Sequence, residues 1–418
     1  MDLASHRLPS DVESPYRQRE RRRLAELGYI LEDVGFDACG IICAVRKVGA
    51  ATHGNVKRAL GALAQMAHRS GEVQGEGDGC GVLTDIPRRL WRETLTASGL
   101  DPELVAQPSF FVGHYFIPQD VNPREALDHL RVLAGRYGAR VLLERRGLTQ
   151  SSVLGPSAAL TEPLFYQVAG TVEGETDAER GRALHRLAVA LEAGAPVHVV
   201  SQSCHTVVYK VRGSAEILDR YYPELRRPEF ESVATIGHNR YSTNTMSTFE
   251  QVQPFTLLGH NGEINTIKRL RGEGLALGVT LTGGSDSQDL NRILEHLVHE
   301  RGLSLLEALE LAFPPVLGEV KGFSPALQDA YMGLRQAFGP LAQGPAALVT
   351  RLGNECVFSV DALGLRPLWF GETEKEFFWS SERGVVPLGA FIGDPRPMAP
   401  GEKMLATLRA GSITPMAH

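Results

Sequence analysis

The sequence has few cysteines, no long apolar run and no excess of basic residues. Its five cysteines include no Cys-x-x-Cys pair, so neither a disulfide scaffold nor an iron–sulfur cluster is expected. No stretch approaches the roughly 20 apolar residues that cross a bilayer, and the N-terminus lacks a secretory apolar core. With 43 Lys and Arg against 49 Asp and Glu, the formal net charge is -6, which disfavours a nucleic-acid-coating surface. We therefore expect a cytoplasmic globular protein that binds neither membrane nor nucleic acid.

The chain of 418 residues is predicted to consist of a leader and one domain. Residues 1–38 are polar, carry the run Arg21-Arg22-Arg23, and show little periodic apolar content, so we interpret them as a leader and a candidate propeptide. The domain, residues 39–418, opens with the apolar run Cys39 to Val45. The length and β-branched content of that run predict a buried strand.

The pattern of the remaining segments predicts an α+β fold. Helical spacing of apolar residues over 55–69 predicts an amphipathic helix that ends before Gly71. Leucine-rich helices are expected over 288–300 and 303–313. Short β-rich runs, which indicate antiparallel hairpins, lie at residues 197–201, 206–211, 347–350, 356–360, 368–370 and 377–380. The helices do not alternate with the strands as in βαβ units, so we expect helices packed on antiparallel sheets.

Two motifs invite a cofactor or metal but have simpler explanations. The glycine-rich stretch Gly75 to Gly81 precedes a strand-like run instead of a helix, so we expect a structural turn rather than a nucleotide loop. His296 and His299 lie one helical turn apart, but no third ligand is visible at suitable spacing. An exposed helix face is the expected interpretation, with no metal.

Two polar segments follow apolar runs and could contribute to one site. The segment His238 to Thr245 follows the run Val233 to Ile236, and its Arg240 could bind a carboxylate. Asn261-Gly262 is a pair most often found in tight turns, yet its side-chain amide and backbone N–H can also face an oxyanion. From the residues alone, both interpretations of each segment remain open.

A third segment, Ser285 to Gln288, opens a helix and fits a capping box. Capping alone explains its composition, although Asp286 could instead meet a substrate ammonium. Cys39 is a further candidate residue, although a buried strand cysteine is usually inert packing. Cleavage after Ala38 would give Cys39 a free α-amine with a pKa of about 8, suited to act as its base.

Together these segments resemble the class II glutamine amidotransferase domain of the glutamate synthase large subunit, one of the N-terminal nucleophile hydrolases. The resemblance runs from Asp37 to about the end of the chain. It is carried by Asp37–Ile41, His68-Arg69, Gly77–Gly81, Tyr221–Pro223, His238–Thr245, Gly259–Asn265, Ser285–Ser287, Gly344–Ala347 and Gly364–Pro367. The Tyr-Tyr-Pro and His-Asn-Gly-Glu-Ile-Asn contexts are similar specifically to glutamate synthase.

The resemblance implies a four-layer αββα sandwich and the hydrolysis of L-glutamine to L-glutamate and ammonia, without a cofactor or metal. It implies that Cys39 attacks the side-chain amide carbon and forms a thioester, while Asn261 and the Gly262 N–H hold the oxyanion. Further positions are implied to bind the substrate. These are Arg240 for the α-carboxylate, Asp286 for the α-ammonium, and Arg69, Ser242 and Thr243.

The sequence departs from the family pattern at two places. The family usually has His-Arg-Gly-Gly and an aspartate before the Gly-Asp-Gly turn, whereas here the run before that turn, His68 to Gln74, is shorter, and Cys80 replaces the usual alanine. The sequence also stops where the synthase region, with its flavin and iron–sulfur cluster, would follow. We therefore expect a stand-alone glutaminase component whose ammonia passes to a separately encoded synthase-type subunit.

Two other functions remain open at this point. One is a non-catalytic glutamine-binding regulatory module that retains its leader and never exposes the Cys39 amine. The other is an amide hydrolase for a different small substrate, which the pair Arg240 and Asp286 disfavours because it suits a free amino acid. The intact mass of the purified protein distinguishes the enzyme, which would begin at Cys39, from the regulatory module, which would retain its leader.

Overall fold

The computed structural model describes residues 39–73, 75–241, 247–281, 283–339, 341–386, 388–408 and 415–417. The predicted leader lies outside the described residues. Within those ranges, none of the helices has both the length and the apolar character needed to span a bilayer.

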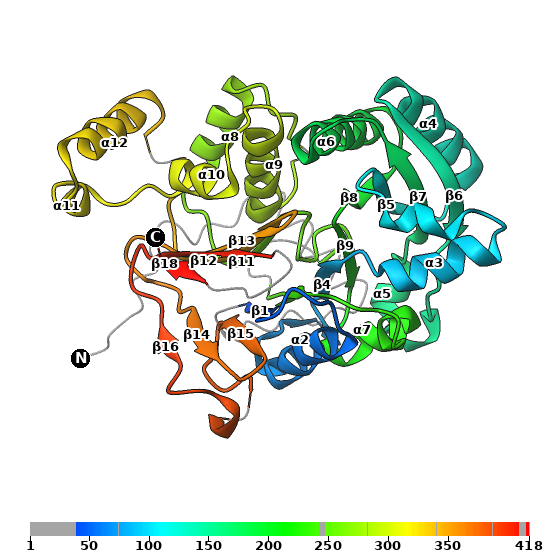
Figure 1. The fold of residues 1–418 in the computed structure, drawn as a ribbon, viewed down its shortest axis with the longest axis horizontal. Coiled ribbons are helices and arrows are strands. Elements are labelled where there is room, and N and C mark those ends of the chain that lie inside the picture. Colours follow the sequence, from blue (N-terminus) through cyan, green and yellow to red (C-terminus); the bar gives the residue numbers. More distant parts are fainter. Residues whose placement is uncertain are drawn as a thin grey trace, which may run out of the picture.

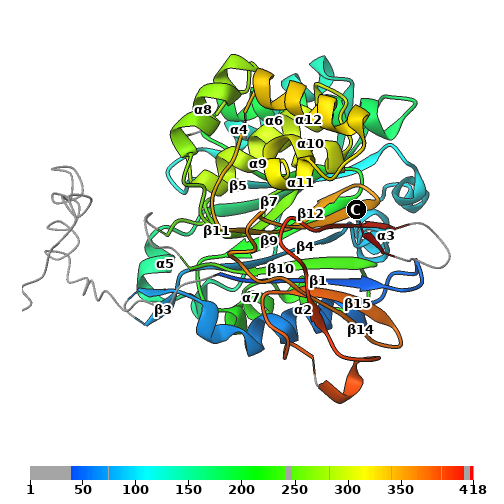
Figure 2. The same cartoon turned by 90° about the vertical axis from the view of Figure 1, so that its left-hand side faces the viewer.

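An antiparallel seven-stranded sheet forms the middle of the described structure (Figures 1 and 2). Its order is β16 (Arg396–Pro397), β14 (Trp369–Glu372), β15 (Glu376–Ser380), β1 (Gly40–Arg46), β10 (Ala234–Asn239), β4 (Cys80–Asp85) and β9 (Thr206–Val211). The strand predicted near residues 39–45 is therefore β1. It is central in its sheet and buried along most of its length.

Two further antiparallel sheets lie on one face of this sheet. The five-stranded sheet has the order β11 (Leu258–Gly262), β12 (Ala346–Leu352), β13 (Glu355–Val360), β17 (Lys403–Thr407) and β18 (Met416–Ala417). The four-stranded sheet has the order β6 (Ala139–Arg146), β7 (Leu164–Val172), β5 (Phe110–Ile117) and β8 (His198–Ser203). A small hairpin, β2 (Glu72–Val73) and β3 (Glu76–Gly77), stands apart.

Helices cover both outer faces of the sheets (Figure 2). On one side, α2 (His53–Gln65) and α7 (Ala215–Tyr221) pack on the seven-stranded sheet. On the other side lie α8 (Ile267–Ala276), α9 (Asp286–His299) and α10 (Leu305–Ala312), beside α4 (Pro123–Arg136) and α6 (Asp177–Gly194). The shorter or peripheral helices are α3 (Arg88–Ala97), α5 (Pro156–Leu160), α11 (Leu317–Val320) and α12 (Pro325–Ala337). The expected α+β class with antiparallel sheets in an αββα order is confirmed.

Most of the predicted local structure is confirmed, with one exception in the strands. The predicted helix over 55–69 is α2 followed by a turn of 3-10 helix, Ala67–Arg69, and the glycine-rich stretch is the β2–β3 hairpin and the turn before β4. The runs at 197–201 and 206–211 are β8 and β9, but they do not form a hairpin. β8 pairs with β5 and β9 with β4, because the short link between them carries the chain from one sheet to another.

An aromatic stack joins the two facing sheets at the centre of the fold. The rings of Trp379 on β15 and Phe358 on β13 lie 3.6 Å apart and nearly parallel, and both side chains are buried. Neighbouring apolar residues from β1, β10 and β12 complete this layer. Large aromatic side chains dominate such interfaces because each removes a large apolar area from water.

We predict that Trp379→Ala lowers the free energy of unfolding by about 3–5 kcal/mol, because it leaves a cavity between the sheets. Trp369→Ala is the control, since Trp369 is only half-buried on β14 near the sheet edge. Urea unfolding of both variants checks the prediction. Equal losses in the two variants would contradict the central role of the stack.

Candidate active site

Cys39 lies at the start of β1, next to the end of β10. Gly40 pairs with Asn239, so Cys39 faces the residues that continue β10. The backbone N–H of Tyr241 donates to Cys39 Sγ at 3.3 Å, and Sγ lies 3.5 Å from the Tyr241 carbonyl oxygen. Backbone pairing of β1 with β10 therefore holds Cys39 beside Tyr241, the residue that follows Arg240.

The environment of Cys39 keeps its thiol protonated at neutral pH. Its side chain is buried, with a relative exposure of 9%. Burial raises the pKa of the Cys39 thiol to about 11, although a hydrogen bond from the Tyr241 backbone and the charge of Arg240 oppose this shift. A protonated thiol is a poor nucleophile, so attack by Cys39 would require a base that removes its proton.

Arg240 follows β10 and is oriented by a buried ion pair. Its Nη1 lies 2.7 Å from Asp78 Oδ1, and the two side chains are only 5% and 3% exposed. Its backbone N–H donates to the Gly79 carbonyl at 2.7 Å, so the Gly77–Gly79 turn contacts Arg240 twice. Removing one partner of such a buried pair costs about 3–5 kcal/mol. The turn before β4 thus fixes where the guanidinium points.

Asn261 and Gly262 end β11, and Ser381 links them to β1. Asn261 Nδ2 donates to Ser381 Oγ at 3.1 Å, and the same oxygen accepts the Ile41 N–H at 3.1 Å. Ile41 is two residues from Cys39, so the hydroxyl connects the strand of the thiol with the strand of the amide. Among the described residues, no partner is found for the buried Asn261 Oδ1.

Only glycine fits at position 262. Its φ is +151°, and a Cβ there would lie 1.8 Å from the Pro345 carbonyl oxygen. β11 runs beside β12 with Gly262 paired to Ala346, which explains this close approach. The Asn-Gly pair is therefore part of a tightly packed strand end and not a solvent-exposed turn.

Asp286 is the first residue of α9 and is tied to the chain that leaves β11. Its Oδ2 accepts the Ile264 N–H at 2.8 Å, and its Oδ1 accepts the Ser287 N–H at 2.7 Å. The capping box predicted from Ser285 and Gln288 is present. Ser287 Oγ also lies 2.8 Å from His260 Nδ1, so α9 contacts β11 next to Asn261.

Arg69 lies near Cys39, but its guanidinium pairs with Glu382. A Cβ on Gly40 would lie 3.4 Å from the Arg69 Cβ, which places Arg69 beside the start of β1. His68 Nε2 also contacts Glu382, at 2.6 Å. Although burial opposes the shift, hydrogen bonds from Arg69 and His68 lower the pKa of Glu382. Substrate binding by Arg69 stays a prediction.

Two other predicted substrate positions, Ser242 and Thr243, lie outside the described residues.

The expectation that His296 and His299 form an exposed helix face is wrong, because both are half-buried. The His299 ring stacks on His185 of α6 at 5.3 Å, since α9 packs against α6 there. In the described ranges, no group of three or more His, Cys, Asp or Glu side chains could hold a metal.

The supporting residues Asp78, Ser381, Glu382 and Arg366 were not predicted as site residues. Asp78 and Arg366 lie within the Gly77–Gly81 and Gly364–Pro367 motifs, and the charge of Arg366 acts on the Cys39 thiol. Their presence in those motifs is the only sequence signal for them. Ser381 and Glu382 follow β15 and carry no local signal of a site.

Comparison with known families identifies the family of the chain. A family model described as glutamine amidotransferases class-II matches residues 39–273 and 275–417. The chain belongs to the class II glutamine amidotransferases. The match begins at Cys39 and includes every described residue of the site above. The chain is thus an amidotransferase of this class, as the resemblance implied.

Glutamate synthases are among the similar proteins. The amidotransferase is 33% identical over 412 residues to ferredoxin-dependent glutamate synthase 2 of Synechocystis, covering 90% of this chain and 26% of that protein. It is 28% identical over 416 residues to the NADH glutamate synthase of Saccharomyces cerevisiae, covering 91% and 19%. The chain therefore spans about a quarter or less of the length of these curated relatives.

Solved structures that match the chain include the glutamine phosphoribosylpyrophosphate amidotransferase of B. subtilis, complexed with ADP and GMP. The sequence identity is 13% and the TM-score 0.44, with 90% of this chain and 49% of that chain covered.

We predict that Gly262→Ala lowers the free energy of unfolding by about 3 kcal/mol or more, because a Cβ there forces β11 away from β12. Gly272→Ala is the matched control, since nothing lies within 4 Å of a Cβ at that position on α8. Alanine is a better helix former than glycine, so the control should gain about 0.5–1 kcal/mol. Thermal unfolding measures both, and a mild effect at Gly262 would show that the strand end is loosely packed.

Proposed function

We propose that this amidotransferase hydrolyses L-glutamine to L-glutamate and ammonia through a thioester on Cys39. The observation that carries the proposal is the position of Cys39 Sγ against the Tyr241 backbone, together with the Arg240–Asp78 pair next to Tyr241 and the Ser381 hydroxyl that links Asn261 to β1. These groups supply a nucleophile, a carboxylate-binding cation and an oxyanion donor at one end of two sheets.

The nucleophile requires cleavage of the leader before Cys39. A family-model match that begins at residue 39 supports an N-terminus there. The α-amine of a terminal cysteine has a pKa of about 8 and can accept the thiol proton at neutral pH. Because burial raises the pKa of the Cys39 thiol to about 11, such a base is needed for attack.

In the proposed first half-reaction, the α-amine takes the thiol proton and Sγ attacks the side-chain amide carbon of glutamine. The carbonyl oxygen gains negative charge, which the Asn261 amide and the Gly262 N–H stabilise. An amide NH2 has two donors, so Asn261 can bond Ser381 with one hydrogen and the oxyanion with the other. The protonated amine then gives its proton to the amide nitrogen, the C–N bond breaks, ammonia leaves, and a thioester remains.

In the second half-reaction, water attacks the thioester carbon while the same amine accepts its proton. The C–S bond breaks, the thiol regains a proton, and L-glutamate leaves. Arg240, oriented by Asp78, suits a bidentate bond to the substrate α-carboxylate. Asp286 at the start of α9 would accept from the α-ammonium, and the two together favour a free amino acid over a peptide glutamine.

We propose that the ammonia passes to a synthase-type partner subunit encoded separately. In the relatives from Synechocystis and yeast, the matched region is 26% and 19% of a longer glutamate synthase, which supports a partner of that type.

We predict that Cys39→Ala abolishes glutamine hydrolysis and leaves the leader attached, because the thiol is required for both acyl transfers. Ammonia release and intact mass measure the two effects. Cys43→Ala is the matched control, since Cys43 is a buried cysteine on the same strand. It should be processed and active. A wild-type protein that keeps its leader and binds glutamine without turnover would favour the regulatory module instead.

A further inference from the structure

We infer that Lys210 is a positioning residue for substrate binding, and that Lys210 and Gln288 together clamp the backbone carbonyl of Glu250. The clamp joins the segment that follows Arg240 to the helix that begins at Asp286. It thereby fixes the separation of the two side chains proposed to hold the ends of an α-amino acid. This inference rests on the proposed roles of Arg240 and Asp286.

The clamp consists of two donors on one acceptor. Lys210 Nζ, from β9, donates to the Glu250 carbonyl at 2.8 Å. Gln288 Nε2, from the first turn of α9, donates to the same oxygen at 3.1 Å. A carbonyl oxygen has two lone pairs, so both bonds can form at once. Two elements distant in sequence therefore hold one point of a connecting segment.

The clamped segment contacts the Arg240 side of the site. The Ser247 hydroxyl donates to the Asp78 carbonyl, next to the Asp78 carboxylate that pairs with Arg240. Val252 packs against Gly79, where an added Cβ would lie 2.4 Å from Val252 Cγ2. The Gly79 carbonyl in turn accepts the Arg240 N–H. A shift of the segment would therefore move the groups that orient the guanidinium.

The other end of the clamp reaches the Asp286 side. Gln288 is two residues after Asp286, and its Oε1 accepts the Ser285 N–H at 2.9 Å in the capping box. The side chain of Gln288 thus uses its oxygen to fix the start of α9 and its nitrogen to bind Glu250. The same segment also reaches β11, because Gln253 Oε1 accepts the His260 N–H at 2.8 Å.

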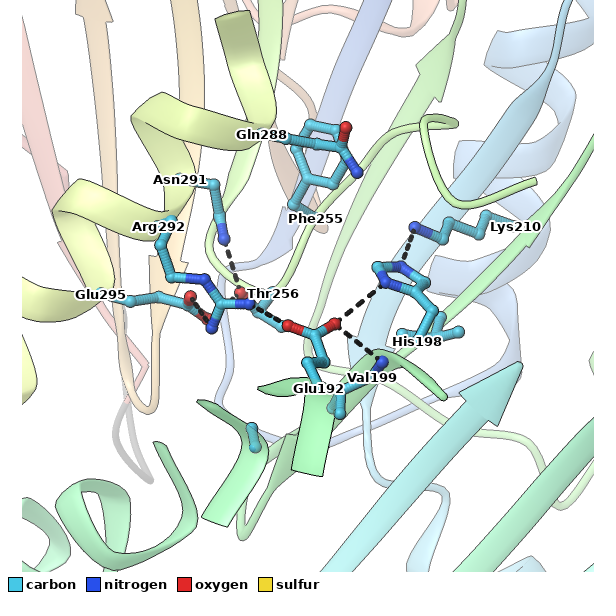
Figure 3. Close-up of a pocket in the computed structure, with 12 residues that line it drawn as sticks. Glu192, His198, Val199, Lys210, Phe255, Thr256, Gln288, Asn291, Arg292 and Glu295 are labelled. Carbon is cyan, nitrogen blue, oxygen red and sulfur yellow. Dashed lines mark hydrogen bonds and ion pairs between the residues drawn. The ribbon is translucent and has the colours of Figure 1, made fainter. Parts of the chain in front are cut away.

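The Lys210 amine also begins a chain of polar contacts that leads through His198 and Glu192 to Arg292. Figure 3 shows Lys210 pointing to His198, which in turn contacts Glu192, while Glu192 also meets Arg292. Lys210 Nζ lies 3.2 Å from His198 Nε2, and His198 Nδ1 lies 3.0 Å from Glu192. These residues line a cavity of about 50 Å³ between β9, α6 and α9.

Lys210 is costly to bury, and its own strand does not require it. The side chain is 1% exposed, and burial lowers its pKa to about 7. β9 is already held by backbone pairing with β4 from Cys80 to Asp85. The amine makes two polar contacts, with His198 and with the Glu250 carbonyl, and only the second reaches the segment that contacts the Arg240 side of the site, which points to a positioning role.

The test uses the whole chain and compares two buried lysines. Lys210→Met removes the clamp donor, whereas Lys403→Met removes a lysine of 3% exposure on β17 that bonds the Phe313 carbonyl at 3.3 Å and Glu310 at 3.1 Å. We expect Lys210→Met to raise the KM for glutamine about tenfold with kcat within about twofold, since it weakens binding of the substrate and of the transition state equally. Lys403→Met should leave KM unchanged even if it lowers the melting temperature as much.

A second variant removes the other donor without removing the helix cap. Gln288→Glu keeps an acceptor for Ser285 but has no N–H for Glu250, so its KM should also rise. Because both variants act on one carbonyl, the double variant should raise KM by less than the product of the two single effects. Calorimetric titration with L-glutamine should show the same order of affinities.

Each outcome decides the inference. A KM for Lys210→Met equal to that of the wild type, with only a lower melting temperature, would make Lys210 merely structural and overturn the clamp while glutamine hydrolysis stands. A loss confined to kcat, or strictly multiplicative effects in the double variant, would overturn it as well. A wild-type chain that neither binds nor hydrolyses glutamine would overturn the proposed function and the clamp together.

Discussion

Antiparallel pairing of β1 with β10 is the constraint from which the rest of the site follows. The register that sets Gly40 opposite Asn239 brings Cys39 Sγ to the Tyr241 N–H and places Arg240 beside it. Because both strands are central in a seven-stranded sheet, a shift of one residue would turn every buried side chain to the wrong face. Pairing at the centre of the sheet thus fixes the position of Cys39.

Around this pairing, buried polar contacts connect the elements that carry the site. Asp78 orients Arg240, Ser381 joins Asn261 to β1, and Asp286 binds the Ile264 N–H beyond β11. Each contact removes polar groups from water, which is unfavourable unless every partner is supplied. The arrangement therefore tolerates little displacement. Such rigidity suits catalysis, because an oxyanion donor is effective only when it is aligned before charge develops.

Local patterns in the sequence predict much of this fold. The strand at β1, the helix α2, the capping box of α9 and the turn before β4 all arise from interactions within a few residues, and each is confirmed. The prediction that β8 and β9 pair as a hairpin is wrong, because the pattern of apolar residues does not reveal which sheet a strand joins. The motifs carry Cys39, Arg240, Asn261 and Asp286, whereas their supports come from far away in sequence. Asp78 is 162 residues from Arg240, and Ser381 is 120 residues from Asn261, distances at which no local pattern links two residues.

The proposed chemistry requires Cys39 to be a nucleophile at the N-terminus of a glutamine site. The most direct measurement is mass-spectrometric mapping after incubation with 6-diazo-5-oxo-L-norleucine, a glutamine analogue whose electrophilic carbon alkylates a nucleophile that attacks the amide position. We expect one adduct, on a Cys39 that begins the polypeptide, formed with the L-enantiomer and prevented by excess L-glutamine. An unlabelled Cys39, or equal labelling by the D-enantiomer or at the other buried cysteines, would contradict it.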